Sequence, residues 1–326
     1  MRAVDDRPYK SLVLTATWQE KKNMIYWRKR KEALAMKRIL ALTLCAILLL
    51  FAGCDAPAEP SAPTQEQLST QSTEQTQPST EPTQETVQPD PMEPTEHEPA
   101  PNPFEPWDFE YVDGYLTCTA APAMLGVDVS KYQGDIDWQK VAAAGVEFAM
   151  IRIGNRGYGA AGKISLDAYA LDNIAQAQAA GLQVGVYFYS QALNEAEAIE
   201  EAEFVLDALT GIQLQLPVTF DWEVFENGET KGRTYGMKAE EVTPCAVAFC
   251  ETIRAAGRQA MVYFNPEMAM DLLYLEQLTD YGFWLAQYGD AMAFPYKVDM
   301  WQYTSAGKVD GIGGKVDLNL CFLPNG

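Results

Sequence analysis

Eight short runs of apolar, β-branched and aromatic residues recur along the last two hundred residues, and this recurrence constrains the fold most strongly. The first five runs are separated by helical patterns, three of which begin at Asn194, at Thr243-Pro244 and at Asn265-Pro266. Alternating strands and helices form parallel sheets, and eight strands can close into a barrel. The predicted strands cover residues 125–130, 147–154, 182–190, 216–224, 259–266, 282–288, 298–303 and 315–322.

The last three runs lie too close together for regular strand–helix units. Only about ten residues separate Tyr288 from Val298, and Tyr303 from Lys315, which is marginal for a parallel crossover that carries a helix. We therefore predict an irregular TIM-like α/β barrel over residues 113–326, with about five βα units followed by three strands that lack regular helices.

Residues 36–53 have a basic start followed by about a dozen apolar residues, which is typical of an export signal. The sequence Phe51-Ala52-Gly53-Cys54 resembles the end of a bacterial lipoprotein signal, with Cys54 as the lipidated residue. An uncleaved membrane anchor is the alternative interpretation. Both interpretations place the rest of the chain outside the cytoplasm and tethered to a membrane. We expect it to be lipid-anchored to the outer face of a bacterial cell membrane, or secreted. We interpret residues 1–35 as an extension upstream of the true translation start.

Residues 54–112 are rich in Pro, Thr, Gln and Glu, and they contain neither Lys nor Arg. A segment with so few apolar residues cannot offset its ordering entropy by burial, so we predict a disordered, acidic stalk. The only histidine of the chain, His97, falls in this stalk.

The predicted barrel contains no histidine, which excludes Ser-His-Asp and Cys-His catalysis and removes the commonest zinc ligand. No pair of its cysteines has the spacing of a zinc site, so we expect no metal and no cofactor. Cys118 and Cys321 flank the strands and could form a disulfide or remain free thiols. The chain carries 24 Lys and Arg against 45 Asp and Glu, so we expect no nucleic-acid partner.

Carboxylates remain as the candidate chemistry, and they occur where the predicted strands end. Side chains alternate along a strand, so Asp221 and Glu223 share one face while Phe220 and Trp222 share the other. The same alternation places Asp128 opposite its valine neighbours and Asp317 opposite Val316. Active sites of barrels collect at the carboxyl ends of strands, so we predict that Asp128, Asp221, Glu223 and Asp317 converge on one mouth.

Aromatic and amide side chains near the same strand ends are candidates for sugar binding, because flat rings stack on pyranoses and phenols donate hydrogen bonds. Any one of these rings could equally be part of the core. The candidates are Tyr132, Tyr187, Tyr189, Tyr263, Trp284, Gln287, Trp301, Gln302, Tyr303 and Asn319.

Four segments carry a resemblance to a known family: "GVDVSKYQGDIDW", "FDWE", "WLAQY" and "MWQYTSAGKVDGIGGKVDLN". In this order, from Gly126 to Asn319, they resemble glycoside hydrolase family 25, the N-acetylmuramidase type of lysozyme. The resemblance implies a barrel of five βα units and three further strands. It also implies cleavage of the β-1,4 bond between N-acetylmuramic acid and N-acetylglucosamine in peptidoglycan. Members often carry a histidine in the region where this chain has Phe188. This difference affects a contact in a sugar subsite and not the pair of acids.

The same resemblance implies a role for each acid: Glu223 is the general acid/base, Asp221 its partner, and Asp128 and Asp317 support the pocket. Residues two apart on a strand are about 6.5–7 Å apart, between the separations typical of retaining and inverting pairs, so spacing does not choose the mechanism. We favour a retaining route in which Asp221 assists the substrate's own 2-acetamido group.

Two other functions remain open at this stage. The domain could be a non-catalytic glycan-binding lipoprotein, or a chitinase-like hydrolase of N-acetylglucosamine polymers. The expected partners are peptidoglycan strands and the membrane, through a lipid anchor, and we expect a monomer.

Overall fold

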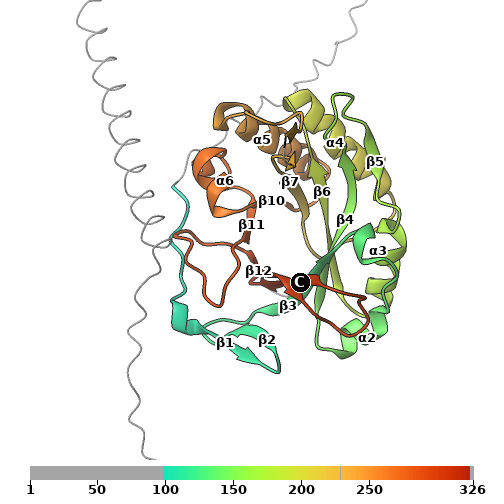
Figure 1. Cartoon of the computed structure of the whole chain (residues 1–326), viewed down its shortest axis with the longest axis vertical. Coiled ribbons are helices and arrows are strands. Elements are labelled where there is room, and N and C mark those ends of the chain that lie inside the picture. Colours follow the sequence, from blue (N-terminus) through green and yellow to red (C-terminus); the bar gives the residue numbers. More distant parts are fainter. Residues whose placement is uncertain (1–97, 228, 324–326) are drawn as a thin grey trace, which may run out of the picture. The chain divides into compact units, whose positions relative to one another are not determined.

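The structure is a computed structural model that describes residues 98–227 and 229–323 (Figure 1). Every predicted run forms a strand, and eight strands pair in the order β3-β13-β12-β11-β10-β7-β6-β4, with β3 also paired to β4. The barrel is therefore closed, as predicted. Its strands are β3 (Met124–Val129), β4 (Phe148–Arg156), β6 (Gln183–Ser190), β7 (Val218–Trp222), β10 (Ala260–Phe264), β11 (Gly282–Ala286), β12 (Met300–Gly307) and β13 (Val316–Cys321).

Helices follow the early strands and lie outside the barrel wall (Figure 1). They are α2 (Trp138–Ala143), α3 (Ala170–Ala179), α4 (Glu195–Ala208), α5 (Ala239–Ala255) and α6 (Pro266–Asp271), with short 3-10 helices η1 (Pro106–Asp108), η2 (Lys131–Gln133) and η3 (Leu275–Gln277). Asn194 and Asn265 cap α4 and α6, as their positions predict.

The start of α5 was predicted wrongly. The helix begins at Ala239, so Pro244 lies inside it. The side chain of Glu241 accepts a hydrogen bond from the Lys238 backbone N–H (3.1 Å). This contact, in an acidic first turn, favours a helix start before the Thr-Pro pair.

The C-terminal third has the irregularity that the short spacings predict. Strands β10, β11 and β12 are parallel, but β13 runs antiparallel to both β12 and β3. No helix separates β11 from β12 or β12 from β13 among the residues that the structure describes.

The folded part begins earlier than residue 113, where the barrel domain was predicted to start. A hairpin of β1 (Phe109–Val112) and β2 (Tyr115–Cys118) precedes the barrel, and Asn102 donates a side-chain hydrogen bond to the Phe294 carbonyl (2.9 Å). The ring of Phe104 packs against Phe322 at 4.7 Å. The predicted boundary is wrong because these aromatic residues bury apolar surface, which the polar residues upstream of them cannot do.

Three shorter strands lie outside the eight strands of the barrel. β5 (Ile164–Leu166) extends the sheet by pairing antiparallel with β4, and β8 (Glu226–Asn227) pairs with β9 (Thr230–Lys231) in the segment after β7. None of these three strands was predicted from the sequence.

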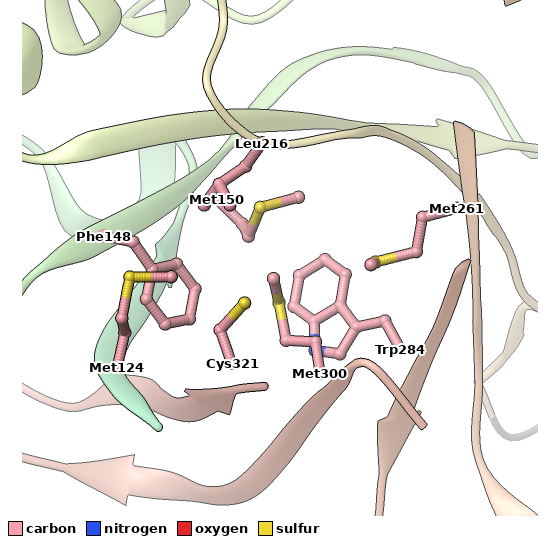
Figure 2. Packing of buried hydrophobic residues seen from close by; sticks show 8 residues of the cluster. All are labelled: Met124, Phe148, Met150, Leu216, Met261, Trp284, Met300 and Cys321. Carbon is pink, nitrogen blue, oxygen red and sulfur yellow. The ribbon is translucent and has the colours of Figure 1, made fainter. Parts of the chain in front are cut away.

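A cluster of buried apolar side chains fills part of the barrel interior, and we call this cluster the floor. Figure 2 shows these side chains pointing toward one another between the strands. Gly126 makes room for the ring of Phe148, because a Cβ at residue 126 would lie 2.2 Å from a ring carbon. The floor consists of Met124, Phe148, Met150, Leu216, Met261, Trp284, Met300 and Cys321.

The four cysteines of the described residues, Cys118, Cys245, Cys250 and Cys321, are free, so the alternative of free thiols holds in this structure. None of the helices between residues 98 and 323 is long and apolar enough to cross a bilayer. The predicted upstream extension, the signal with Cys54, and the stalk as far as His97 lie outside the described residues.

Candidate active site

The predicted acids meet at the carboxyl end of the parallel strands. The Cα atoms of Asp128 on β3 and Asp317 on β13 are register partners, and Asp221 on β7 is flanked by Tyr189 on β6 and Tyr263 on β10. These residues and Glu223 line a cavity of about 250 Å³, which we call the mouth. Its lining comprises Asp128, Val129, Ser130, Tyr132, Gln133, Arg152, Tyr187, Tyr189, Asp221, Glu223, Tyr263, Trp284, Tyr288, Gln302 and Asp317.

Asp128 is held by two amide groups. Gln302 and Asn319 both donate hydrogen bonds to its Oδ2, each at 2.8 Å. Burial raises the pKa of Asp128 to about 7, and the charge of Asp317 adds to the rise, while the two amide hydrogen bonds oppose it. Burial also raises the pKa of Asp317 to about 6. The setting of these two supporting acids therefore disfavours two negative charges side by side.

Asp221 has an unused acceptor. Its Oδ1 is buried and has no hydrogen-bond partner among the described residues. Burial raises its pKa well above the usual value, and the charges of Glu223 and Asp128 raise it further, whereas Arg152 lowers it. A buried acceptor without a partner is costly, and it is a place where a ligand N–H can bind.

Glu223 follows directly after β7 and is only partly exposed. Burial raises its pKa, and the charge of Asp317 raises it further. A carboxyl group with a raised pKa keeps its proton at higher pH and can donate it to a leaving oxygen.

Most of the predicted sugar-binding residues do line the mouth: Tyr132, Tyr187, Tyr189, Tyr263, Trp284 and Gln302. Tyr263 and Tyr288 donate hydrogen bonds to Oε1 of Gln302 (3.3 and 3.1 Å), which orients the Gln302 amide toward Asp128. The ring of Trp284 packs edge-on against Tyr263 at 5.1 Å and forms part of the floor as well.

Four predicted contacts lie outside the mouth lining. Trp301 and Tyr303 occupy the outward phase of β12; the Trp301 ring packs against Phe109 at 4.9 Å, and the Tyr303 hydroxyl accepts a hydrogen bond from the Leu116 N–H. Gln287 lies in the loop between β11 and β12, where its Oε1 accepts a hydrogen bond from the Ala293 N–H (2.7 Å). Asn319 is fully buried beneath Asp128, so it supports that acid instead of facing the cavity.

Four further residues line the mouth that were not predicted from the sequence: Arg152, Tyr288, Ser130 and Gln133. Arg152 shares the inward phase of β4 with Met150, so alternation could have found it. Its guanidinium donates to Oδ2 of the buried Asp167 (2.9 and 2.6 Å) and lies 5.1 Å from the centre of the Tyr132 ring. Tyr288 ends the run "WLAQY", only two residues beyond β11.

The described residues contain no group of three or more His, Cys, Asp or Glu side chains arranged to hold a metal ion. Paired carboxylates at the mouth of an α/β barrel are instead the arrangement that glycoside hydrolysis uses.

Comparison with known proteins places the chain in a family. Residues 127–312 match the model of Glycosyl hydrolases family 25, and the chain belongs to that family. It is 26% identical over 200 residues to the autolytic lysozyme of Clostridium acetobutylicum, an alignment that covers 60% of this chain and 55% of that protein.

Solved structures share the fold. The modular autolysin LytC from Streptococcus pneumoniae aligns with a TM-score of 0.55 and 24% identity, over 65% of this chain and 51% of LytC. A family 25 glycosyl hydrolase from Bacillus anthracis aligns with a TM-score of 0.51 and 22% identity, over 66% of this chain and 93% of that one. This chain thus spans about half the length of both the autolytic lysozyme and LytC.

Proposed function

We propose that the protein is a peptidoglycan hydrolase that cleaves the β-1,4 bond between N-acetylmuramic acid and N-acetylglucosamine. The observation that carries the proposal is the pair Asp221 and Glu223, which line one cavity and both have raised pKa values. Membership of family 25 and the similarity to an autolytic lysozyme support this choice of substrate.

In this proposal Glu223 is the general acid. Its raised pKa keeps a proton available for the leaving oxygen, and once deprotonated it can take a proton from the attacking water in the second step. Asp128 and Asp317 assist by keeping the mouth crowded with carboxyl groups, which opposes ionisation of Glu223.

Asp221 acts on the sugar side of the bond. Its unpartnered Oδ1 can accept the N–H of the substrate's 2-acetamido group, which orients the acetamido carbonyl for attack on the anomeric carbon. The positive charge that develops there favours the ionised form of Asp221. Because both displacement steps invert the anomeric carbon, the overall reaction retains its configuration.

The test is digestion of purified peptidoglycan and of chitin, followed by analysis of the new reducing ends. The proposal expects N-acetylmuramic acid at the new reducing ends of peptidoglycan. New ends on chitin alone would indicate the chitinase-like activity, and binding without new ends on either polymer would indicate a glycan-binding protein.

We further propose that the protein works at the outer face of a bacterial membrane as a lipid-anchored monomer, with Cys54 as the lipidated residue. The signal-like residues 36–53 and the polar composition that follows support this proposal. Cys54→Ser is expected to release the protein from the membrane fraction, and unchanged membrane association would indicate the apolar segment as the anchor.

A further inference from the structure

The two central acids are held in different ways. Asp221 is paired on both sides, with Tyr189 of β6 and Tyr263 of β10. Strand β7 ends at Trp222, which pairs with Ser190, and none of the registered pairs of the described strands includes Glu223. The sheet therefore fixes Asp221 but leaves the backbone of Glu223 to other contacts.

Side-chain hydrogen bonds replace the backbone hydrogen bonds of the sheet at Glu223. Gln191 is fully buried, and its Nε2 donates to the backbone carbonyl of Glu223 at 2.5 Å and to that of Ser190 at 3.1 Å. The hydroxyl of Thr234, also fully buried, lies 3.1 Å from Oε1 of Gln191 and 3.3 Å from the Glu223 carbonyl. Both polar atoms of the Gln191 side chain are thus engaged: Nε2 bridges the Ser190 and Glu223 carbonyls, and Oε1 accepts from Thr234.

A buried ion pair supports Gln191 from behind. The backbone N–H of Gln191 donates to Oε1 of Glu201 (3.4 Å), and the Ser190 hydroxyl donates to its Oε2 (2.5 Å). Arg156 donates to the same Glu201 carboxyl at 2.6 Å. Glu201 is fully buried, so α4 presents a carboxyl group whose acceptors fix the end of β6.

The segment that returns from Glu223 to Thr234 is attached to the barrel as well. The ring of Phe225 stacks on Tyr158 with a centroid distance of 3.8 Å. Arg233 donates through its backbone N–H to the Tyr158 carbonyl (3.0 Å) and through its side chain to Glu197 (2.7 Å). These contacts bring Thr234 back beside Glu223.

We propose that Gln191, together with Thr234, is a positioning residue that holds the Glu223 carboxyl where it can protonate the leaving oxygen. The inference rests on the general-acid role assigned to Glu223 under the proposed function. Gln191 does not line the mouth, so it acts through the Glu223 backbone and not on the sugar.

The test compares Gln191→Met, which keeps the length of the side chain and removes its hydrogen bonds, with wild type on two substrates. On natural glycan the variant is expected to lose about 10²-fold in kcat, the effect of a displacement of about 1 Å, with KM nearly unchanged. On a glycoside with an activated leaving group, which hardly needs protonation, the variant is expected to recover most of the lost rate.

A pair of milder variants repeats the test at the second contact. Thr234→Val is nearly isosteric and lacks the hydroxyl, whereas Thr234→Ser retains it, so only Thr234→Val is expected to show the same dependence on the leaving group. Asn173→Ala is the matched control, because Asn173 is a buried amide that accepts from Trp138 Nε1 away from the mouth. It is expected to lower stability without any dependence on the leaving group.

Crystal structures of wild type and Gln191→Met provide a readout that does not depend on activity. A shift of Glu223 relative to an unmoved Asp221 supports the inference, even if the wild-type protein cleaves no glycan and the proposed function fails. An unmoved Glu223, unchanged kcat, or an equal loss on both substrates overturns it. If Gln191→Met does not fold, the comparison of Thr234→Val with Thr234→Ser on the two substrates tests the inference by the same criteria.

Discussion

The floor and the mouth are built from the same strands, yet their inward positions carry opposite chemistry. On β3 the inward residue is Met124 in the floor and Asp128 in the mouth, and on β13 it is Cys321 below and Asp317 above. The floor therefore stabilises the barrel by burial, while the mouth holds acids whose raised pKa values show that their ionised forms are disfavoured. Stability and reactivity are separated by only a few residues along each strand.

The largest expected effect is the loss of turnover when the mouth loses its proton donor. Glu223→Gln keeps the size of the side chain and removes the donated proton, so kcat on peptidoglycan is expected to fall by about 10²- to 10⁴-fold with little change in glycan affinity. Asp221→Asn is expected to lower kcat as well, because it removes the charge that stabilises the cationic sugar side.

A substrate with an activated leaving group separates the two acids. On it Glu223→Gln is expected to regain much of its rate for glycosidic cleavage, whereas Asp221→Asn stays slow. The two losses are not expected to add fully, because both side chains act on one transition state. Equal rescue of both variants, or of neither, would contradict this division of roles.

Alternation along the strands predicted much of the mouth, because inward phase is a local property of a strand. It placed Asp128, Asp221, Glu223 and Asp317 on one side, and all four line one cavity. The same rule shows why Trp301 was misplaced: it is adjacent to Gln302, and neighbours on a strand cannot both face inward.

The next largest effect belongs to the floor. Phe148→Ala removes a fully buried ring that packs beneath the mouth, so the free energy of unfolding is expected to fall by about 3–5 kcal/mol in chemical denaturation. The folded fraction of the variant is expected to show the same dependence on the leaving group as wild type. A changed dependence would show that the floor also controls the position of the acids.

Contacts between distant segments could not be predicted from the sequence. Gln191 reaches the Glu223 carbonyl across 32 positions, and Trp284 reaches Asn319 across 35. No local pattern distinguishes Gln191 from a solvated polar residue after a strand. Its role depends on how far β7 extends beside β6, which only the assembled barrel decides.

A smaller effect is expected in the pH dependence of stability. The folded pKa of Asp128 is raised to about 7 from a usual value of 3.8, so the folded state binds more protons than the unfolded state between these limits. The free energy of unfolding therefore falls as pH rises from about 4 to 7, by up to about 1.4 kcal/mol per pH unit for this group. Chemical denaturation across this range measures the slope.

Asp128→Asn is the matched variant for that slope. Its amide oxygen can still accept from Gln302 and Asn319 at the position of Oδ2, but it does not titrate. The slope is expected to become shallower, and the stability at pH 7 to rise relative to wild type. An unchanged slope would mean that other buried acids, such as Glu201 with its pKa raised to about 7, control the pH dependence.

The smallest expected effect is at the rim of the mouth, where Tyr132 is 78% exposed and covers Arg152. Its ring can stack on a sugar but does not fix any of the acids, so Tyr132→Ala is expected to raise KM about fivefold, equivalent to about 1 kcal/mol, with kcat nearly unchanged. Tyr235→Ala is the control, because Tyr235 is also exposed and has a cation, Lys231, 4.2 Å from its ring centre, yet does not line the mouth. Steady-state kinetics on soluble glycan fragments compares the two. A fall in kcat for Tyr132→Ala would place this ring among the groups that position Arg152 and the acids, and the division between rim and mouth would then be wrong.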